Sequence, residues 1–365
     1  MRWRAVGGLL GAAVLAAAVL VLREQVPPPA YSAAPEPPIT AELVDRPGLP
    51  AFEPMRTPRW RQFTPPRRAL DGVVGVQYLL HTRTDRDSVE FIVQRRDTGE
   101  QAPAYSVPQD EAPWSGVLHR GLLLVSHGYP EVRLVVLDPA AQQPSPIREL
   151  TPPPGYSFSP HLVELGDEVL MPGRQQDPAR SCVLAVQPQS GAARPVWCAP
   201  QGRSPGWLYA GVDQVVWPEF TNPPTVCPHW FRLRAGGEVE QLVGHPALCG
   251  AREVTDFGGW QVTLRSEHTG ARPQITATDG SRRLVLGTAA GFVACGRHVY
   301  WSAAAHGAGE DTLYRWRPGT EHREVVHRSS RLVLTAPRCS EGVLSVGEMA
   351  GSGPRMVELR ALNRP

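Results

Sequence analysis

Side chains able to do chemistry recur at one place in the sequence, six residues after a series of regularly spaced glycines. Imidazole, guanidinium, carboxylate and indole groups all occur there, and they would meet if the segments that carry them were arranged in a ring. Such groups bind polar ligands, and imidazole and carboxylate also bind first-row metals. The predicted ligand-binding residues are His81, His127, Trp217, Arg265 and Glu348.

No catalytic motif accompanies these candidates. The chain has no G-x-S-x-G and no H-E-x-x-H, and Ser126 precedes His127 only as a neighbour in sequence. Charged loop residues are usually solvated, and the geometry of a metal site does not follow from repeats alone. We therefore predict no catalytic residue, no metal and no cofactor.

One candidate, Trp217, stands in an unusual segment. Pro218, Phe220 and the pair Pro223-Pro224 follow it within a few residues. A proline-rich loop with two large aromatic side chains predicts an exposed lip that binds a ligand or partner.

The spacing of the glycines defines a repeat. Successive intervals are 46, 45, 45, 48, 37 and 46 residues, and each glycine precedes a strand-like run of Leu, Val, Tyr and Trp. A four-stranded β-propeller blade occupies about 40–45 residues. The sequence predicts an all-β fold of seven four-stranded blades, with six as the alternative because the first repeat is the least regular. The glycines are Gly75, Gly121, Gly166, Gly211, Gly259, Gly296 and Gly342.

The two ends of the repeat region complement each other. The last repeat stops at Pro365 without a fourth strand, and residues 57–64 have strand-like composition. We expect residues 57–64 to supply the missing outer strand, which closes the ring and hides a sheet edge.

The run Val299-Tyr-Trp-Ser302, followed by Leu313-Tyr-Arg315, resembles the repeats of TolB-like and YWTD-like β-propellers. The resemblance covers about residues 60–365, although the string Tyr-Trp-Thr-Asp itself is absent. It implies the fold and no particular function, because propellers host binding, scaffolding and catalysis alike.

The N-terminal segment predicts export. Arg2 and Arg4 precede an apolar run of eighteen residues, Ala5 to Leu22, which is long enough to span a bilayer with the N-terminus in the cytoplasm. We expect a signal anchor, a transmembrane helix, in residues 1–25, a Pro-rich linker in 26–56 and the propeller domain in 57–365. The alternative is a cleaved signal peptide, which leaves a secreted or periplasmic protein.

The six cysteines all follow the apolar run, and an even number outside the cytoplasm predicts disulfides. Within the repeat frame, neighbours in sequence also become neighbours in space. We expect three bridges, Cys182–Cys198, Cys227–Cys249 and Cys295–Cys339.

Composition narrows the function. The net charge of +2 gives no electrostatic case for nucleic acid. Without a catalytic motif, the main interpretation is a membrane-tethered, non-catalytic module that binds an exported protein or a small ligand. The alternative is a propeller hydrolase or lyase that acts on sugars or peptides at the channel mouth. A sensor ectodomain is disfavoured because the predicted cytoplasmic tail, residues 1–4, is very short.

Overall fold

The computed structural model describes the chain from Glu53 to Asn363. Within this range it does not describe residues 55–57, 67–68, 102–104, 113–114, 129, 142–146, 222–226, 243–247, 266–272, 290, 304–310, 330–331 and 351–355. The predicted anchor in residues 1–25, and the linker up to residue 52, lie outside the described part. In the described part, no helix has the length and apolar character needed to span a membrane.

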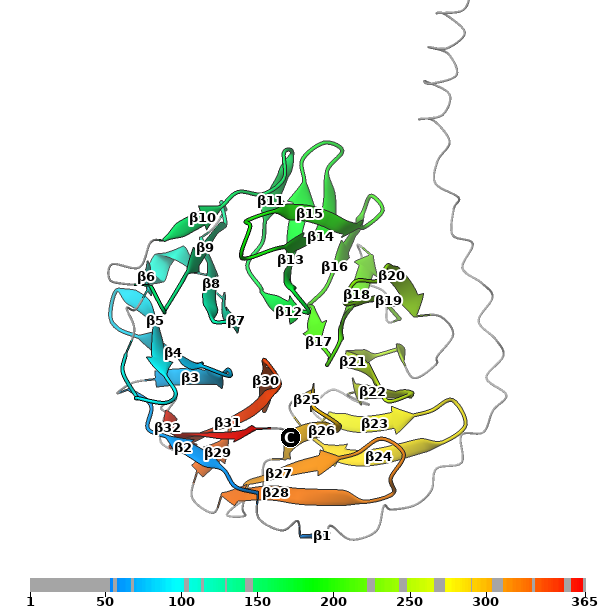
Figure 1. Ribbon diagram of the computed structural model, residues 1–365. Coiled ribbons are helices and arrows are strands. Elements are labelled where there is room, and N and C mark those ends of the chain that lie inside the picture. Colours follow the sequence, from blue (N-terminus) through cyan, green and yellow to red (C-terminus); the bar gives the residue numbers. More distant parts are fainter. Residues whose placement is uncertain are drawn as a thin grey trace, which may run out of the picture. The chain divides into compact units, whose positions relative to one another are not determined.

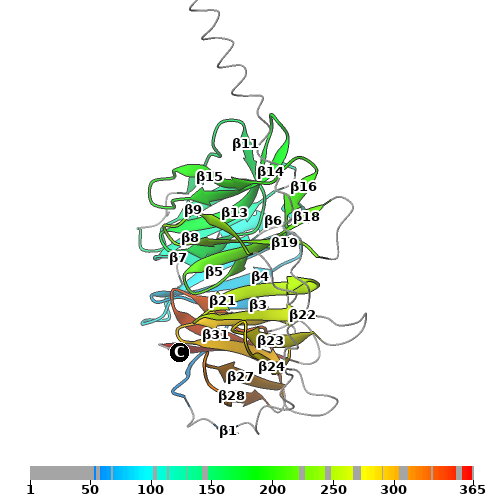
Figure 2. The same ribbon diagram turned by 90° about the vertical axis from the view of Figure 1, so that its right-hand side faces the viewer.

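Seven antiparallel sheets stand around a common axis as the blades of a propeller (Figure 1). Within each sheet, the strands are ordered from the axis outwards, and Figure 2 shows the same ribbon from the side. The prediction of seven four-stranded blades is therefore confirmed, and the alternative of six is wrong.

The strands follow one another from the inner to the outer edge of each blade. Blades 1 to 3 consist of β3 (Ala69–Val74), β4 (Tyr78–Thr84), β5 (Ser88–Arg95) and β6 (Tyr105–Pro108); of β7 (Ser115–His119), β8 (Leu122–His127), β9 (Arg133–Leu137) and β10 (Arg148–Leu150); and of β11 (Tyr156–Phe158) with β12 (Val163–Leu165), β13 (Glu168–Gln175), β14 (Arg180–Val186) and β15 (Ala193–Cys198). A short 3₁₀ helix, η1 (Gln109–Glu111), follows β6.

Blades 4 to 7 repeat this order. They consist of β16 (Arg203–Pro205) with β17 (Tyr209–Ala210), β18 (Gln214–Thr221), β19 (His229–Arg234) and β20 (Val239–Leu242); of β21 (Ala251–Phe257), β22 (Trp260–Arg265), β23 (Gln274–Thr278) and β24 (Arg283–Thr288); of β25 (Phe292–Cys295), β26 (His298–Ala303), β27 (Asp311–Trp316), β28 (Arg323–Ser329) and β1 (Glu53–Pro54); and of β29 (Leu332–Leu334) with β30 (Arg338–Ser340), β31 (Val343–Ala350), β32 (Met356–Asn363) and β2 (Arg61–Phe63).

Successive side chains of a strand point to opposite faces of the sheet, and apolar side chains on both faces produce the core. In β8, Leu123 and Val125 pack with residues of blade 1, whereas Leu124 packs with residues of blade 3. Each blade thus buries both faces against its neighbours. The hydrophobic core is a ring of interfaces between blades.

The ring is closed by the segment that precedes blade 1. Strand β2 pairs with β32 in antiparallel register, with Arg61 opposite Ala361 and Phe63 opposite Leu359. This pairing confirms the predicted closing strand. Strand β1, from the end of the predicted linker, pairs in parallel with β28 at the outer edge of blade 6.

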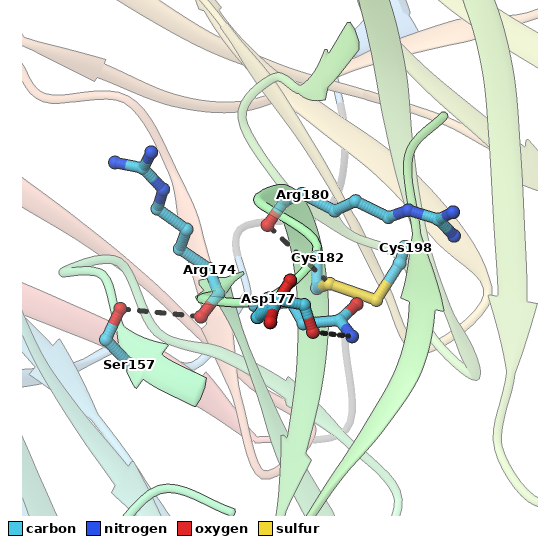
Figure 3. Close-up of a disulfide and its surroundings, with 7 residues drawn as sticks. Ser157, Arg174, Asp177, Arg180, Cys182 and Cys198 are labelled. Carbon is cyan, nitrogen blue, oxygen red and sulfur yellow. Dashed lines mark hydrogen bonds between the residues drawn. A yellow bond between two sulfur atoms is a disulfide. The ribbon is translucent and has the colours of Figure 1, made fainter. Parts of the chain in front are cut away.

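All three predicted disulfides are present. Cys182 and Cys198 face each other across β14 and β15 within blade 3 (Figure 3). The Cys227–Cys249 bridge flanks the two outer strands of blade 4, and the Cys295–Cys339 bridge joins the inner strands of blades 6 and 7. A chain with three such bridges belongs to an oxidising compartment outside the cytoplasm.

Candidate functional site in the central channel

The five predicted binding residues lie inside and between the blades. His81 and Trp217 are fully buried, and His127 and Glu348 are nearly so. Arg265 ends β22 and donates a hydrogen bond to the carbonyl oxygen of Cys249. None of the five lines the cavities of the central channel. Their expected place at the channel mouth is wrong. Each of these residues lies on the second strand of its blade, so the first strand stands between it and the axis. Ligand binding by these residues stays a prediction.

The expected exposed lip is wrong for Trp217 and Pro218, which are buried, whereas Pro223 and Pro224 lie outside the described residues. The Trp217 side chain packs against Trp197 and Phe231, with ring centroids 5.8 and 6.2 Å away. Its indole therefore belongs to the core between blades 3 and 4.

Two of the predicted residues join blades through polar contacts. His127 Nδ1 lies 2.6 Å from Glu111 Oε2, and the Tyr105 hydroxyl lies 2.9 Å from His127 Nε2, which connects blades 1 and 2. Glu348 accepts hydrogen bonds from His327 Nε2 and Arg360 Nε, at 2.6 and 2.7 Å, and so connects blades 6 and 7. Burial opposes ionisation of Glu348, but these two donors outweigh it and lower its pKa. Such satisfied pairs stabilise the blade interfaces.

The first strand of every blade lines a cavity on the propeller axis, which we call the inner channel. Its volume is about 370 Å³, and its lining includes Val73 of blade 1, Val117 of blade 2, Val293 of blade 6 and residues of the remaining four blades. The polar and charged residues that line the inner channel are His161, Glu164, Tyr209, Glu253, Thr255, Arg338 and Ser340.

A second cavity, the channel mouth, continues from the inner channel and shares Glu164, Ala210, Val293 and Cys339 with it. It has a volume of about 560 Å³ and is lined by the turns between the first and second strands. Five of the repeat glycines line it. Gly121 and Gly342 adopt φ values of +77° and +73° there, which favour glycine.

Glu253, on β21, is an inner-channel residue whose pKa departs strongly from its ordinary value. Its Oε2 accepts a hydrogen bond from the Phe292 amide at 3.3 Å, and no arginine or histidine among the described residues pairs with it. Burial therefore raises its pKa to about 7. Burial, aided by the nearby Glu253, also raises the pKa of Tyr209 to about 12. At neutral pH the inner channel thus holds a phenol beside a carboxyl that is near half-protonation.

Glu164, on β12, is a second carboxyl of the channel. Burial raises its pKa, although His119 Nδ1 lies 3.7 Å from its Oε1 and Ser340 Oγ lies 3.5 Å from the same oxygen. His119 Nε2 is buried without a hydrogen-bond partner among the described residues. Arg338, the arginine that lines the inner channel, forms an ion pair with Asp71.

The inner strands of blades 3 and 4 are interrupted, and two ring side chains meet at the interruptions. His161 donates a hydrogen bond from Nε2 to the Leu208 carbonyl oxygen at 3.0 Å, and burial lowers its pKa. The Trp207 ring lies edge-on, 4.9 Å from that of His161, and Trp207 is 65% exposed. An exposed indole therefore stands beside a neutral imidazole of the channel wall.

These channel residues escaped the sequence prediction because no motif marks them. The signal lies two residues before the repeat glycines, where His119, Glu164, Tyr209 and Ser340 occur. Strand alternation points this position towards the axis. The repeat led us to the end of the second strand, which is not at the channel. The position two residues before these glycines indicates the channel lining instead.

The arrangement suits acid–base chemistry. Two partly buried carboxyls with raised pKa values and a phenol can each give or accept a proton inside a cavity. Among the residues that the structure describes, no group of three or more His, Cys, Asp or Glu side chains is placed to hold a metal ion.

The chain is similar in fold to solved β-propellers. The β-propeller domain of the Trilobed protease from Pyrococcus furiosus matches with a TM-score of 0.54 and 12% identity, over 82% of this chain and 96% of that chain. The polysaccharide lyase Uly1 matches with a TM-score of 0.53 and 10% identity, over 82% and 90%. The acylaminoacyl peptidase of Pyrococcus horikoshii matches with 0.51 and 12%, over 77% of this chain and 49% of that chain. No protein-family model and no curated protein matches the sequence.

Proposed function

We propose that this protein is an exported hydrolase or lyase that cleaves a polysaccharide in its central channel by general acid–base catalysis. The observation that carries the proposal is the Glu253 carboxyl, which faces the inner channel with a pKa of about 7. A group whose pKa lies near the working pH is an efficient proton donor and acceptor. Without such a role, a buried carboxyl that lacks an ion pair only lowers stability.

Both reaction types need two groups that exchange protons with the substrate. In hydrolysis, one carboxyl protonates the leaving oxygen while the second takes a proton from the attacking water. In elimination, a base removes a carbon-bound proton beside a uronate carboxylate, and an acid protonates the leaving oxygen as the C–O bond breaks. We assign Glu253 and Glu164 to the two roles in hydrolysis, and Glu253 and Tyr209 to the two roles in elimination, because all three line the inner channel.

Two further observations support a sugar substrate. Trp207 offers an exposed flat apolar surface next to the channel, suited to the C–H face of a sugar ring. The similar lyase Uly1 is a polysaccharide lyase by name, and the match spans 90% of that chain. A propeller of this size is therefore a sufficient scaffold for such an activity.

The test is an activity screen of the chain from residue 57 on neutral and acidic polysaccharides, with a peptide mixture as comparison. Hydrolysis is read as new reducing ends, and elimination as the ultraviolet absorbance of the new double bond. We expect activity on a polysaccharide, lowered about 100-fold or more in Glu253→Gln and unchanged in Glu149→Gln, a variant of an exposed glutamate on β10. Cleavage of peptides alone, or equal activity in Glu253→Gln, would contradict the proposal.

The second candidate function is the non-catalytic binding module. The protein matched over 96% of its length is the propeller domain of a protease, so such a propeller also occurs as one part of a larger protein. The screen separates the two functions. A binding module retains a polysaccharide without cleaving it, and Glu253→Gln behaves like the wild type.

We also propose that residues 1–25 hold the domain at the outer face of the membrane and that residues 26–56 act as the spacer. The three disulfides support the exported location. Membrane fractionation tests the anchor, since a retained anchor keeps the chain in the membrane pellet after alkaline washing and a cleaved signal releases it. We also propose, from the repeats, that the propeller belongs with the TolB-like or YWTD-like propellers.

A further inference from the structure

A third cavity lies away from the channel, in the cleft between blades 4 and 5. It has a volume of about 500 Å³, within the range of small-molecule sites, and the ends of β19 and β20 and the turns after β21 and β23 form its walls. We call it the blade 4–5 cleft. None of the residues that form the inner channel lines it.

Three polar atoms of the residues that line this cleft are buried without a hydrogen-bond partner among the described residues. They are Gln214 Oε1, Gln261 Oε1 and Arg232 Nε. Gln214 is 1% exposed and Gln261 8%, so bulk water reaches neither side chain freely. Buried polar groups are almost always satisfied in folded proteins, and several unsatisfied groups at one cavity indicate a missing partner.

The surroundings of these atoms fix their orientation. Gln214 Nε2 donates to Thr255 Oγ1 at 3.3 Å and also to the Asp256 carbonyl oxygen, which leaves Oε1 as the free acceptor. The Arg232 guanidinium pairs with Asp256 and Glu240 through its two terminal nitrogens, which leaves Nε as the free donor.

The chemistry of the cleft points to a neutral partner. Three arginines, Arg232, Arg234 and Arg282, stand at the cleft beside four carboxylates, Asp213, Asp256, Asp279 and Glu240, so the cleft has no excess positive charge to attract an anion. Arg282 donates to Asp279 Oδ2 from Nε and Nη2, at 2.9 and 2.8 Å. Two free acceptors and one free donor match hydroxyl groups, since a hydroxyl both donates and accepts.

We propose that the blade 4–5 cleft binds one unit of a neutral saccharide through Gln214, Gln261 and Arg232. This site is separate from the proposed catalytic channel and does not require catalysis there. On a longer substrate, it would hold a sugar unit outside the channel.

The test uses glucose, galactose, N-acetylglucosamine and their disaccharides as probes, followed by calorimetry and by NMR of the side-chain amides. We expect at least one probe to bind and to shift the Gln214 and Gln261 amide signals of the wild type. Gln261→Leu should weaken that probe about tenfold, because a sugar hydroxyl loses its acceptor. The same variant should melt at a higher temperature without sugar, because the unpaired oxygen is gone.

The matched controls are Gln62→Leu, an exposed residue of β2, and Glu253→Gln, which changes only the channel. Both should bind the probe as the wild type does. The proposal is overturned if no probe binds, if binding shifts other residues and survives Gln261→Leu, or if only inorganic phosphate binds. Loss of probe binding in Glu253→Gln would place the sugar in the channel instead.

Discussion

At the scale of single residues, Glu253 of the channel differs from Glu348 because no cationic side chain among the described residues donates to it. Glu348 is as buried as many core residues, but His327 and Arg360 donate to it and its pKa falls. Within the part of the chain that the structure describes, Glu253 accepts from the Phe292 amide alone, and its pKa rises to about 7. The two carboxyls show how the partner, and not burial alone, decides between a structural and a reactive glutamate.

The raised pKa of Glu253 predicts a pH-dependent cost in stability. Below its ordinary pKa of 4.5 the carboxyl is protonated in both states and costs nothing. As the pH rises to about 7, the unfolded chain ionises first, so folding loses up to about 3 kcal/mol, and the loss persists at higher pH. We expect Glu253→Gln to unfold at higher urea concentration than the wild type at about pH 8 and at a similar one at about pH 4. A constant difference at both pH values would refute the buried, protonated carboxyl.

At the scale of elements, the sequence predicts much of the framework. The repeat glycines mark turns of the chain, and their spacing predicts the number of blades. Strand alternation packs each blade on its neighbours. The repeat frame also predicts which cysteines pair. The direction of each side chain relative to the axis does not follow from the repeat alone. His81 and Trp217 occupy the predicted position in their strands, yet neighbouring blades cover them on both sides. Glu253 has no motif, and its reactivity arises only when seven first strands meet.

The disulfides provide a prediction at this scale. The Cys295–Cys339 bridge closes 44 residues and joins two blades, whereas Cys182–Cys198 closes 16 residues within one blade. A longer closed loop restricts the unfolded chain more, so replacing the first pair with serines should cost about 1 kcal/mol more than replacing the second. Urea unfolding of the two double variants under oxidising conditions checks this order. An equal or reversed cost would mean that packing, and not chain closure, governs the effect.

At the scale of the whole molecule, the ring depends on a strand from the opposite end of the chain. Strand β2 covers the edge of β32, and Phe63 packs against the cluster that contains Val74 and Leu359. A ring that is closed in this way has no free edge in its last blade.

Truncation tests this closure. A chain that begins at residue 57 keeps β2 and should melt like a chain with the whole linker. A chain that begins at residue 66 lacks β2 and should melt several degrees lower, because a loss of about 1–3 kcal/mol shifts the midpoint by roughly 2–4 °C per kcal/mol at this size. It should also associate through the exposed edge of β32, which gel filtration detects. Identical melting of the two chains would show that β2 does not fasten the ring.

The central claim is that the channel is a site of acid–base catalysis by Glu253, and the pH profile of cleavage tests it most directly. On the best polysaccharide from the screen, kcat/KM of the wild type should bend near pH 7, where the Glu253 carboxyl titrates. Glu253→Gln should lose that bend together with about 100-fold or more of the activity. A wild-type bend that persists unchanged in Glu253→Gln would contradict the account, because the titrating group would then lie elsewhere.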